Sequence, residues 1–279
     1  MTPLTFVLVV IAMAFVAGVL GSLLGLGGGM IVVPALTLLL GIDIRLAIGA
    51  SIISVIATSS GAAAAYVRDR LANLRVAMFL ELGTTAGAIT GAWVAGILHP
   101  RWLFVLFGLI LGYSALAMLK PRPRDVVRHH GETRLAHRLR LQSSYFDDAR
   151  GEEVVYDPTR PMFGLALMYI AGIVSGLLGI GSGALKVPAM DLAMELPIKV
   201  STATSNFMIG VTAAASAGLY FARGQIAPFV AAPVAIGVLL GAFAGSKLLS
   251  RVSSRAIRRT FVVVLVVVSL QMLVRGIRG

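Results

Sequence analysis

Lys186 is the residue whose position most directly suggests chemistry, because it is a cation inside an otherwise apolar segment. The glycine-rich stretch 179–183 precedes it, and a similar stretch, 25–29, is followed by Val32 at the matching position. Glycine-rich backbone that interrupts an apolar helix leaves free N–H groups at the start of the next helix, where the helix dipole favours an anion. The expected backbone contacts to a small anionic substrate are Gly27, Gly28, Gly29, Gly181, Ser182 and Gly183. Close packing of helices is the alternative reading of these glycines.

An ionisable residue within a membrane span is a functional candidate, so we expect Lys186 to bind the anion. Alternatively, Lys186 forms a structural ion pair with Asp191, Glu195 or Glu81. Glu81 lies deep in its apolar segment, and burial favours the protonated form of a carboxyl group. Glu81 and Asp191 are therefore candidates for proton coupling, with a purely structural carboxyl as the alternative.

Polar residues follow the second glycine-rich stretch in "KVSTATSNFMIG", residues 199–210. Thr204, Ser205 and Asn206 of this segment, and Ser51 of the corresponding earlier segment, carry hydrogen-bond donors that suit an oxyanion. Hydroxyl groups in such helices also bond to their own backbone or to a neighbouring helix. Lys199, at the start of the segment, is expected to extend its side chain to the membrane interface.

The sequence contains no recognisable catalytic, metal or cofactor site. It has no cysteine, which excludes thiolate ligands and cysteine nucleophiles. Neither glycine-rich stretch is followed by the G-K-[ST] of a phosphate-binding loop, and no G-x-S-x-G surrounds Ser182. The net charge of +12 comes from arginines in short loops beside apolar segments, which indicates membrane topology rather than nucleic-acid binding.

The elements that must position these residues are membrane-spanning helices. Hydrophobic residues make up 58% of the 279 residues, charged residues make up only 13%, and the mean hydropathy is +0.92. Apolar segments are predicted at about 4–25, 30–41, 44–67, 73–98 and 101–119, and again at about 162–181, 184–195, 198–222, 226–250 and 256–274. In each set the second segment is too short to cross a bilayer and suits a half-helix.

The two sets of segments are copies of each other at a fixed separation of 154 positions. Pro34 matches Pro188 and Tyr66 matches Tyr220. Three glycines at four-residue spacing also match, and they favour close helix packing: Gly83, Gly87 and Gly91 with Gly237, Gly241 and Gly245. The predicted fold is an all-α membrane protein with two homologous repeats. Each repeat has about four long transmembrane helices and one short broken or re-entrant helix.

The placement of arginine predicts the orientation of the repeats, because cytoplasmic loops are rich in Lys and Arg. The basic segments are Arg68, Arg70 and Arg75, then 120–161, then Arg251, Arg255, Arg258 and Arg259. If all three are cytoplasmic, each repeat crosses the membrane five times, the repeats are inverted and both termini lie outside. A parallel arrangement with four crossings per repeat is the alternative.

The organisation predicted is a first transmembrane repeat over 1–119, a polar cytoplasmic insert over 120–161 and a second repeat over 162–279. Within the insert, "SSYFDDARGEEVVYDP" indicates two short strands around a turn near 149–151. The insert is a connector, or else it serves regulation or partner docking.

The two motifs "GSLLGLGGGMIVVPAL" and "GLLGIGSGALKVPAM", each followed by a helix with Ser or Thr that ends in "AYVRDR" or "LYFARGQ", resemble those of the TauE/SafE sulfite exporter family. The resemblance covers about 10–119 and 162–273. The motif residues that match are Gly25, Gly27, Gly29, Pro34, Gly179, Gly181, Gly183 and Pro188, with Ser51, Thr204 and Ser205 in the following helices. Two residues depart from the family pattern, Ser182 in place of a glycine and Lys186 in place of an apolar residue.

The resemblance implies a multi-pass transporter of the bacterial inner membrane, without a cofactor or nucleic-acid partner. We expect it to carry a small oxyanion, sulfite or an organosulfonate, with proton coupling through Glu81 as a hypothesis. An anion channel and a transporter of small carboxylates are the nearest alternatives, and a membrane scaffold or an intramembrane enzyme is more distant. The sequence is compatible with a homo-oligomer and sets no subunit number.

Overall fold

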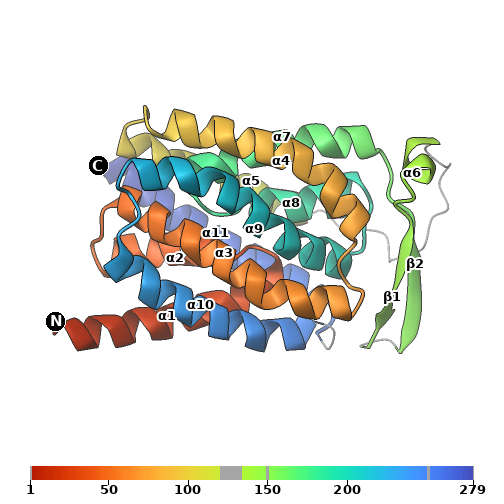
Figure 1. Cartoon of the computed structure of the whole chain (residues 1–279), viewed down its shortest axis with the longest axis horizontal. Coiled ribbons are helices and arrows are strands. Elements are labelled where there is room, and N and C mark those ends of the chain that lie inside the picture. The colour runs from red at the N-terminus through yellow and green to blue at the C-terminus, as the bar shows by residue number, and fades with distance from the viewer. Residues whose placement is uncertain (1, 120–133, 149–150, 250–251, 279) are drawn as a thin grey trace.

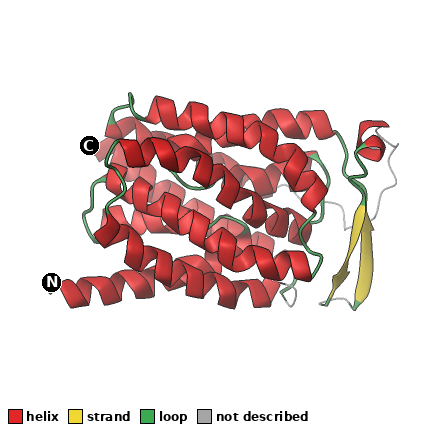
Figure 2. Ribbon diagram, in the orientation of Figure 1, coloured by secondary structure: helices red, strands yellow, loops and turns green. Residues whose placement is uncertain are grey.

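The computed structural model is a bundle of roughly aligned helices with a small strand pair at one end (Figures 1 and 2). It describes residues 2–119, 134–148, 151–249 and 252–278. Both chain termini lie at the end of the bundle opposite to the strands (Figure 1). This placement is compatible with five crossings per repeat, and the inverted orientation across a membrane stays a prediction.

The first repeat contains four long helices and one short one. The long helices are α1 (Pro3–Leu24), α3 (Ile44–Arg68), α4 (Leu74–Ala95) and α5 (Pro100–Leu119). Between α1 and α3, the short helix α2 (Gly29–Pro34) continues into a π-helical turn, η1 (Ala35–Leu39). Pro34 lacks the N–H that a regular turn requires, which accounts for the widened turn that follows it.

The second repeat has the same order of elements. Its helices are α7 (Pro161–Leu178), α8 (Gly183–Pro188), α9 (Ile198–Ala222), α10 (Pro228–Leu249) and α11 (Ser254–Arg278). A π-helical turn, η2 (Ala189–Ala193), follows Pro188 as η1 follows Pro34. The predicted all-α membrane fold with two copies of one helix pattern is confirmed.

Helices of one repeat pack mainly against helices of the other repeat. Helix α1 packs along α10 of the other repeat, and α7 packs along α4. The equivalent helices α3 and α9 contact each other, as do α5 and α11. Because each repeat completes the other, the helix bundle has one shared core.

The regularly spaced glycines make this close packing possible. A Cβ atom added at Gly91 would overlap the carbonyl oxygen of Ile173 on α7, and one at Gly241 would overlap that of Phe15 on α1. The helix-packing prediction for these glycines is therefore confirmed. Small residues at such crossings let helix backbones approach closely, and the van der Waals packing that results contributes to helix association in lipid.

Between the repeats, the chain forms the short helix α6 (Arg134–Arg138) and two antiparallel strands, β1 (Ser143–Asp147) and β2 (Glu152–Tyr156). They lie at the end of the bundle where α4 begins (Figure 1). Residues 120–133 of the predicted insert lie outside the described residues, as do Ala149 and Arg150 at the predicted turn, and Arg251.

Five helices of the described chain are long and apolar enough to cross a membrane: α1, α3, α7, α10 and residues 255–278 of α11. Helices α4 and α9 are of comparable length and are not among these five. Helix α9 carries the largest group of buried polar side chains among the described helices, and α4 carries Glu81. These two helices position the candidate site.

Candidate functional site

The helical backbone is interrupted at equivalent positions of the two repeats, between α1 and α2 and between α7 and α8. These interruptions, residues 25–28 and 179–182, are called the first and the second break. Helix α1 ends at Gly25 with φ of 71°, and α7 ends at Gly179 with φ of 64°, both in the left-handed conformation that favours glycine. Gly27 and Gly181 also have positive φ, and so does Ser182 at 57°, a value that is uncommon for a residue with a side chain.

Each break is held by a serine from the other repeat. The hydroxyl of Ser51 on α3 donates to Gly179 O at 2.7 Å, and that of Ser205 on α9 donates to Gly25 O at 2.8 Å. Both serines are fully buried. Since Ser51 and Ser205 are themselves equivalent positions, this exchange couples the two breaks symmetrically.

A tyrosine of the same repeat donates a hydrogen bond to the end of the helix that precedes each break. Tyr66 donates to Ser22 O at 2.9 Å, and Tyr220 donates to Gly176 O at 2.8 Å. Ser22 and Gly176 lie in the last turn of α1 and α7, where carbonyl groups lack a helical partner. The matched tyrosines of the sequence thus have a matched structural role.

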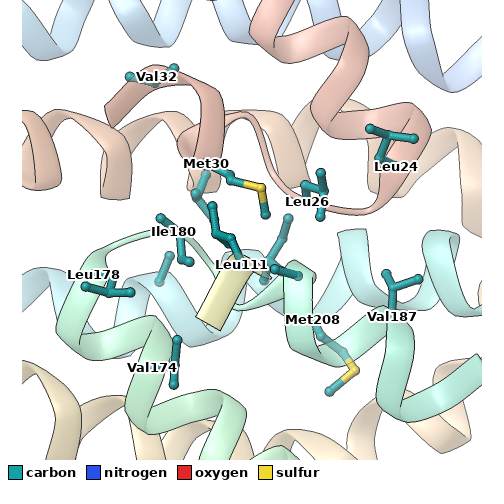
Figure 3. Close-up of a cluster of buried hydrophobic side chains, with 14 of the residues drawn as sticks. Leu24, Leu26, Met30, Val32, Leu111, Val174, Leu178, Ile180, Val187 and Met208 are labelled. Carbon is teal, nitrogen blue, oxygen red and sulfur yellow. The ribbon is translucent and has the colours of Figure 1, made fainter. Parts of the chain in front are cut away.

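Apolar side chains fill the space between the two breaks. Leu26 and Met30 from the first break and Ile180 from the second converge there (Figure 3). The glycines are packed as tightly: a Cβ atom at Gly183 would overlap Gly25 O, and one at Gly29 would overlap the Ser51 hydroxyl. The predicted backbone contacts, Gly27, Gly28, Gly29, Gly181, Ser182 and Gly183, are all buried in this packing.

Beside the second break, Lys186, Thr212 and Glu81 form a buried polar cluster. Lys186 Nζ on α8 donates to Thr212 Oγ1 on α9 at 2.6 Å and lies 3.6 Å from Glu81 Oε2 on α4. The hydroxyl of Thr212 donates to Glu81 Oε1 at 2.6 Å, and Thr85 donates to the same oxygen at 3.1 Å. Lys186 is fully buried, and the Glu81 side chain is 11% exposed.

Of the three acidic partners considered for Lys186, the structure places Glu81 against it. Glu195 is exposed at the end of the segment that follows η2, and Asp191 is fully buried within η2. The first repeat has no equivalent of the cluster, because Val32, Thr58 and Ala235 occupy the matching positions. Among the described residues, Thr58 hydrogen-bonds within its own helix, where it donates to Ser54 O at 2.8 Å.

The other predicted polar residues lie on the first turns of α9 and are fully buried. Asn206 Nδ2 donates to Ser22 O at 2.6 Å, beside the first break rather than the second. Thr204 Oγ1 accepts from the backbone N–H of Asn73 at the start of α4. Ser51 therefore bonds to the second break, and Ser205 and Asn206 bond at the first. Thr204 lies at neither break, and Lys186 and Glu81 are together beside the second.

The prediction that Lys199 extends to the membrane interface is wrong. Lys199 is 1% exposed, and its Nζ donates to Asp147 Oδ1 on β1 at 2.8 Å. The prediction treated the helix as isolated in lipid, whereas the strand pair covers this end of α9.

A protein-family model described as "Sulfite exporter TauE/SafE" matches residues 10–272. The chain belongs to the TauE/SafE family. The match includes both breaks and the whole cluster at Lys186, so these features lie within the part of the chain that the family defines.

This TauE/SafE chain is 28% identical to the "Probable membrane transporter protein YunE" of Bacillus subtilis (strain 168), over 98% of this chain and 99% of that protein. A "Probable membrane transporter protein" of Xylella fastidiosa (strain 9a5c) is 27% identical over 68% of this chain and 64% of its own length. "Probable membrane transporter protein MJ0441" of Methanocaldococcus jannaschii is 26% identical over 72% and 67%. No solved structure matches the chain.

The family, the relatives and the apolar helices together make the chain a membrane transporter and a multi-pass protein of the bacterial inner membrane. Sequence reasoning missed Thr212 as the bridge between Lys186 and Glu81, and Asp147 as the partner of Lys199. The repeat offered a signal for Thr212. Thr212 and Thr58 occupy matched positions, but the second repeat has Lys186 where the first has Val32.

Proposed function

We propose that the chain is a secondary transporter that carries a small oxyanion, sulfite or an organosulfonate, and that Lys186 binds its charge. The observation that carries the proposal is the fully buried ammonium of Lys186, held by Thr212 and Glu81 beside the second break. A buried cation requires a compensating anion. In the conformation described, Glu81 is that anion, and an oxyanion substrate can contact the same ammonium group.

The geometry of Lys186 and Glu81 supports binding of a second anion at the ammonium group while Glu81 stays in place. Lys186 Nζ and Glu81 Oε2 are 3.6 Å apart, beyond hydrogen-bond distance, and Oε2 has no hydrogen-bond partner in the described part of the chain. Glu81 is instead held through its other oxygen by Thr85 and Thr212. A substrate oxygen can therefore approach Lys186 while these hydroxyl groups keep Glu81 in place.

Binding of an anion at Lys186 supplies a reason for proton coupling. The ammonium of Lys186 and the carboxylate of Glu81 balance each other, and an added monoanion would leave a net negative charge among buried side chains. Such charge is costly, so uptake of a proton by Glu81 accompanies binding. Anion and proton are then carried together in the same direction.

The apolar packing between the breaks supports a carrier rather than an open anion channel. Leu26, Met30 and Ile180 lie between the two halves of the bundle (Figure 3), so substrate movement requires the halves to rearrange. Counterflow in proteoliposomes tests this point. Excess unlabelled sulfite inside the vesicles accelerates uptake of labelled sulfite by a carrier and leaves flux through a channel unaccelerated.

The deciding experiment is a thermal-shift screen of the purified protein with sulfite, sulfate, thiosulfate, sulfoacetate and small carboxylates. One class of oxyanion is expected to raise the melting temperature. Lys186→Met abolishes this shift and Lys186→Arg retains part of it, while Lys247→Met, at an exposed position on α10, leaves it unchanged. Normal anion stabilisation of Lys186→Met would show that the lysine is structural and that the proposal is wrong.

A further inference from the structure

A surface groove lies between the two repeats, where η1 of the first repeat meets the last helix of the second. Leu38 of η1 lines one side, and the last turns of α11 line the other with Leu270, Gln271, Val274, Arg275 and Arg278. The volume of the groove is about 370 Å³, which is at the lower end of the range for small-molecule sites. Because α11 is long and apolar enough to cross a membrane, and Leu270 and Val274 are exposed, the groove opens toward lipid.

The lining of the groove changes from apolar to basic along α11. Separations of four residues bring Leu270, Val274 and Arg278 to one side of the helix, and Gln271 and Arg275 follow the same spacing beside them. Arg278 lies beyond Leu270 by about 12 Å along the helix axis, at 1.5 Å per residue. The groove therefore has an apolar part toward the middle of the bundle and a basic part at its end.

The basic part lies at the end of the bundle where both chain termini are found (Figure 1). There, Arg101 at the start of α5 donates through Nε to Gly276 O in the last turn of α11 at 3.0 Å. Its neighbour Trp102 is exposed, and exposed tryptophan is typical of the interface between membrane and water. We therefore place the two arginines of the groove at the depth of lipid headgroups, and its apolar part at the depth of acyl chains.

Contacts within the fold do not account for Arg275 and Arg278. Both side chains are exposed, and neither has a hydrogen-bond or carboxylate partner among the described residues. A basic side chain near the end of a helix can bond to the last carbonyl groups, but at α11 it is Arg101 that does so. Membrane topology does not explain the two arginines either, because in the predicted orientation this end faces the outside, where Lys and Arg are less frequent. Both charges are thus available to a ligand.

We propose that the groove binds one anionic phospholipid of the surrounding membrane, with its phosphate at Arg275 and Arg278 and an acyl chain along the apolar part. Guanidinium groups bind phosphate oxygens through paired hydrogen bonds. Basic pockets between membrane helices are known to bind anionic headgroups. Gln271 carries an amide that can donate to an ester carbonyl of the lipid. The apolar part selects this ligand over a soluble oxyanion, and the site does not depend on the proposed function.

A lipid in the groove also contacts the short helical segment that follows the first break, because Leu38 belongs to η1. Helix α2 of the same segment contacts α11 directly. The bound lipid is therefore expected to hold α2 and η1 against α11. A ligand that binds only the folded state raises its stability, so the lipid should raise the melting temperature of the purified protein.

The test is native mass spectrometry of the purified full-length protein in detergent, with an equimolar mixture of phosphatidylglycerol and phosphatidylcholine. The wild type is expected to retain one phosphatidylglycerol in preference to phosphatidylcholine. Arg275→Gln combined with Arg278→Gln should weaken this preference by about fivefold or more, because it removes the cations at the phosphate. Arg255→Gln combined with Arg259→Gln, an exposed pair at the opposite end of α11, should leave it unchanged. Absence of a preference, or an equal loss in both double variants, would overturn the proposal.

The apolar part of the groove is tested with both arginines in place. Leu38→Trp fills the groove, so it should weaken retention of phosphatidylglycerol and reduce the rise in melting temperature that this lipid causes. Leu39→Trp is the matched control, because Leu39 is 75% exposed and does not line the groove. It should behave as the wild type does. Retention by Leu38→Trp equal to that by Leu39→Trp would show that the lipid binds elsewhere.

Two further outcomes identify other occupants of the groove. Millimolar glycerol phosphate, which has the phosphate without the acyl chains, is expected to leave the retained lipid in place. Displacement of the lipid by glycerol phosphate would assign Arg275 and Arg278 to a soluble anion and refute the lipid site. A wild-type dimer that Leu38→Trp converts to a monomer would show that a second copy of the chain covers the groove, which would also refute it.

Discussion

Removal of the charge of Lys186 alone should destabilise the protein more than removal of both charges of the pair. Breaking a buried ion pair on one side costs about 3–5 kcal/mol, because the remaining charge stays buried without compensation. After Lys186→Met, Glu81 keeps hydrogen bonds from Thr85 and Thr212, and its side chain is 11% exposed. These features place the expected loss at the lower end of that range, about 3 kcal/mol.

The double variant Lys186→Met with Glu81→Gln contains no buried charge. Neutral side chains of similar volume replace a buried pair at little or no cost, so the expected loss is about 1 kcal/mol or less. The two substitutions should therefore be non-additive, with a coupling of about 2 kcal/mol or more.

The measurement is the free energy of unfolding by SDS titration in mixed micelles, followed by loss of helical circular dichroism, for wild type, both single variants and the double variant. Lys247→Met, an exposed lysine on α10, controls for loss of a lysine in general. Additive losses would show that Lys186 and Glu81 do not interact energetically. The geometry of the cluster would then carry no argument about ion pairing or proton uptake.

Three other predictions test the cluster and the repeat. Thr212→Val is expected to alter the pH dependence of sulfite flux in proteoliposomes, because it removes the bridge between Lys186 and Glu81, whereas Thr58→Val, its counterpart in the first repeat, leaves that dependence unchanged. Ser51→Ala and Ser205→Ala should each destabilise by about 1 kcal/mol and by similar amounts in SDS titration, since each breaks one buried bond to the opposite break. Gly91→Ala should lower the yield of folded protein through overlap with Ile173 O, whereas Gly218→Ala on α9, with open space around it, should stabilise by up to about 1 kcal/mol.

The helices and the breaks could be predicted because their causes are local. Mean hydropathy marks the spans, and glycines and prolines at equal separations mark the breaks; the short helices after Gly29 and Gly183 follow directly. The tight glycine packing was also predictable, since four-residue spacing of small residues has few other uses in an apolar helix.

The polar contacts of the site depend on packing between distant segments. Glu81, Lys186 and Thr212 come from three helices, and no local pattern states which of Asp191, Glu195 and Glu81 faces the lysine. The position of Lys199 was predicted wrongly for the same reason. A single helix suggests an interfacial lysine, and only the folded insert supplies Asp147.

Comparison of the two repeats distinguishes the contacts that both repeats share from the contacts that only one end of the transporter has. The serine and tyrosine contacts at the two breaks are equivalent in both repeats, so they stabilise the fold without distinguishing its two ends. The described buried ion pairs, Lys186 with Glu81 and Lys199 with Asp147, have no counterparts on the other side. Both lysines belong to the second repeat, and both carboxylates come from outside it. A bundle with two identical halves could not distinguish its two ends, so these two ion pairs are features by which the ends of this transporter differ.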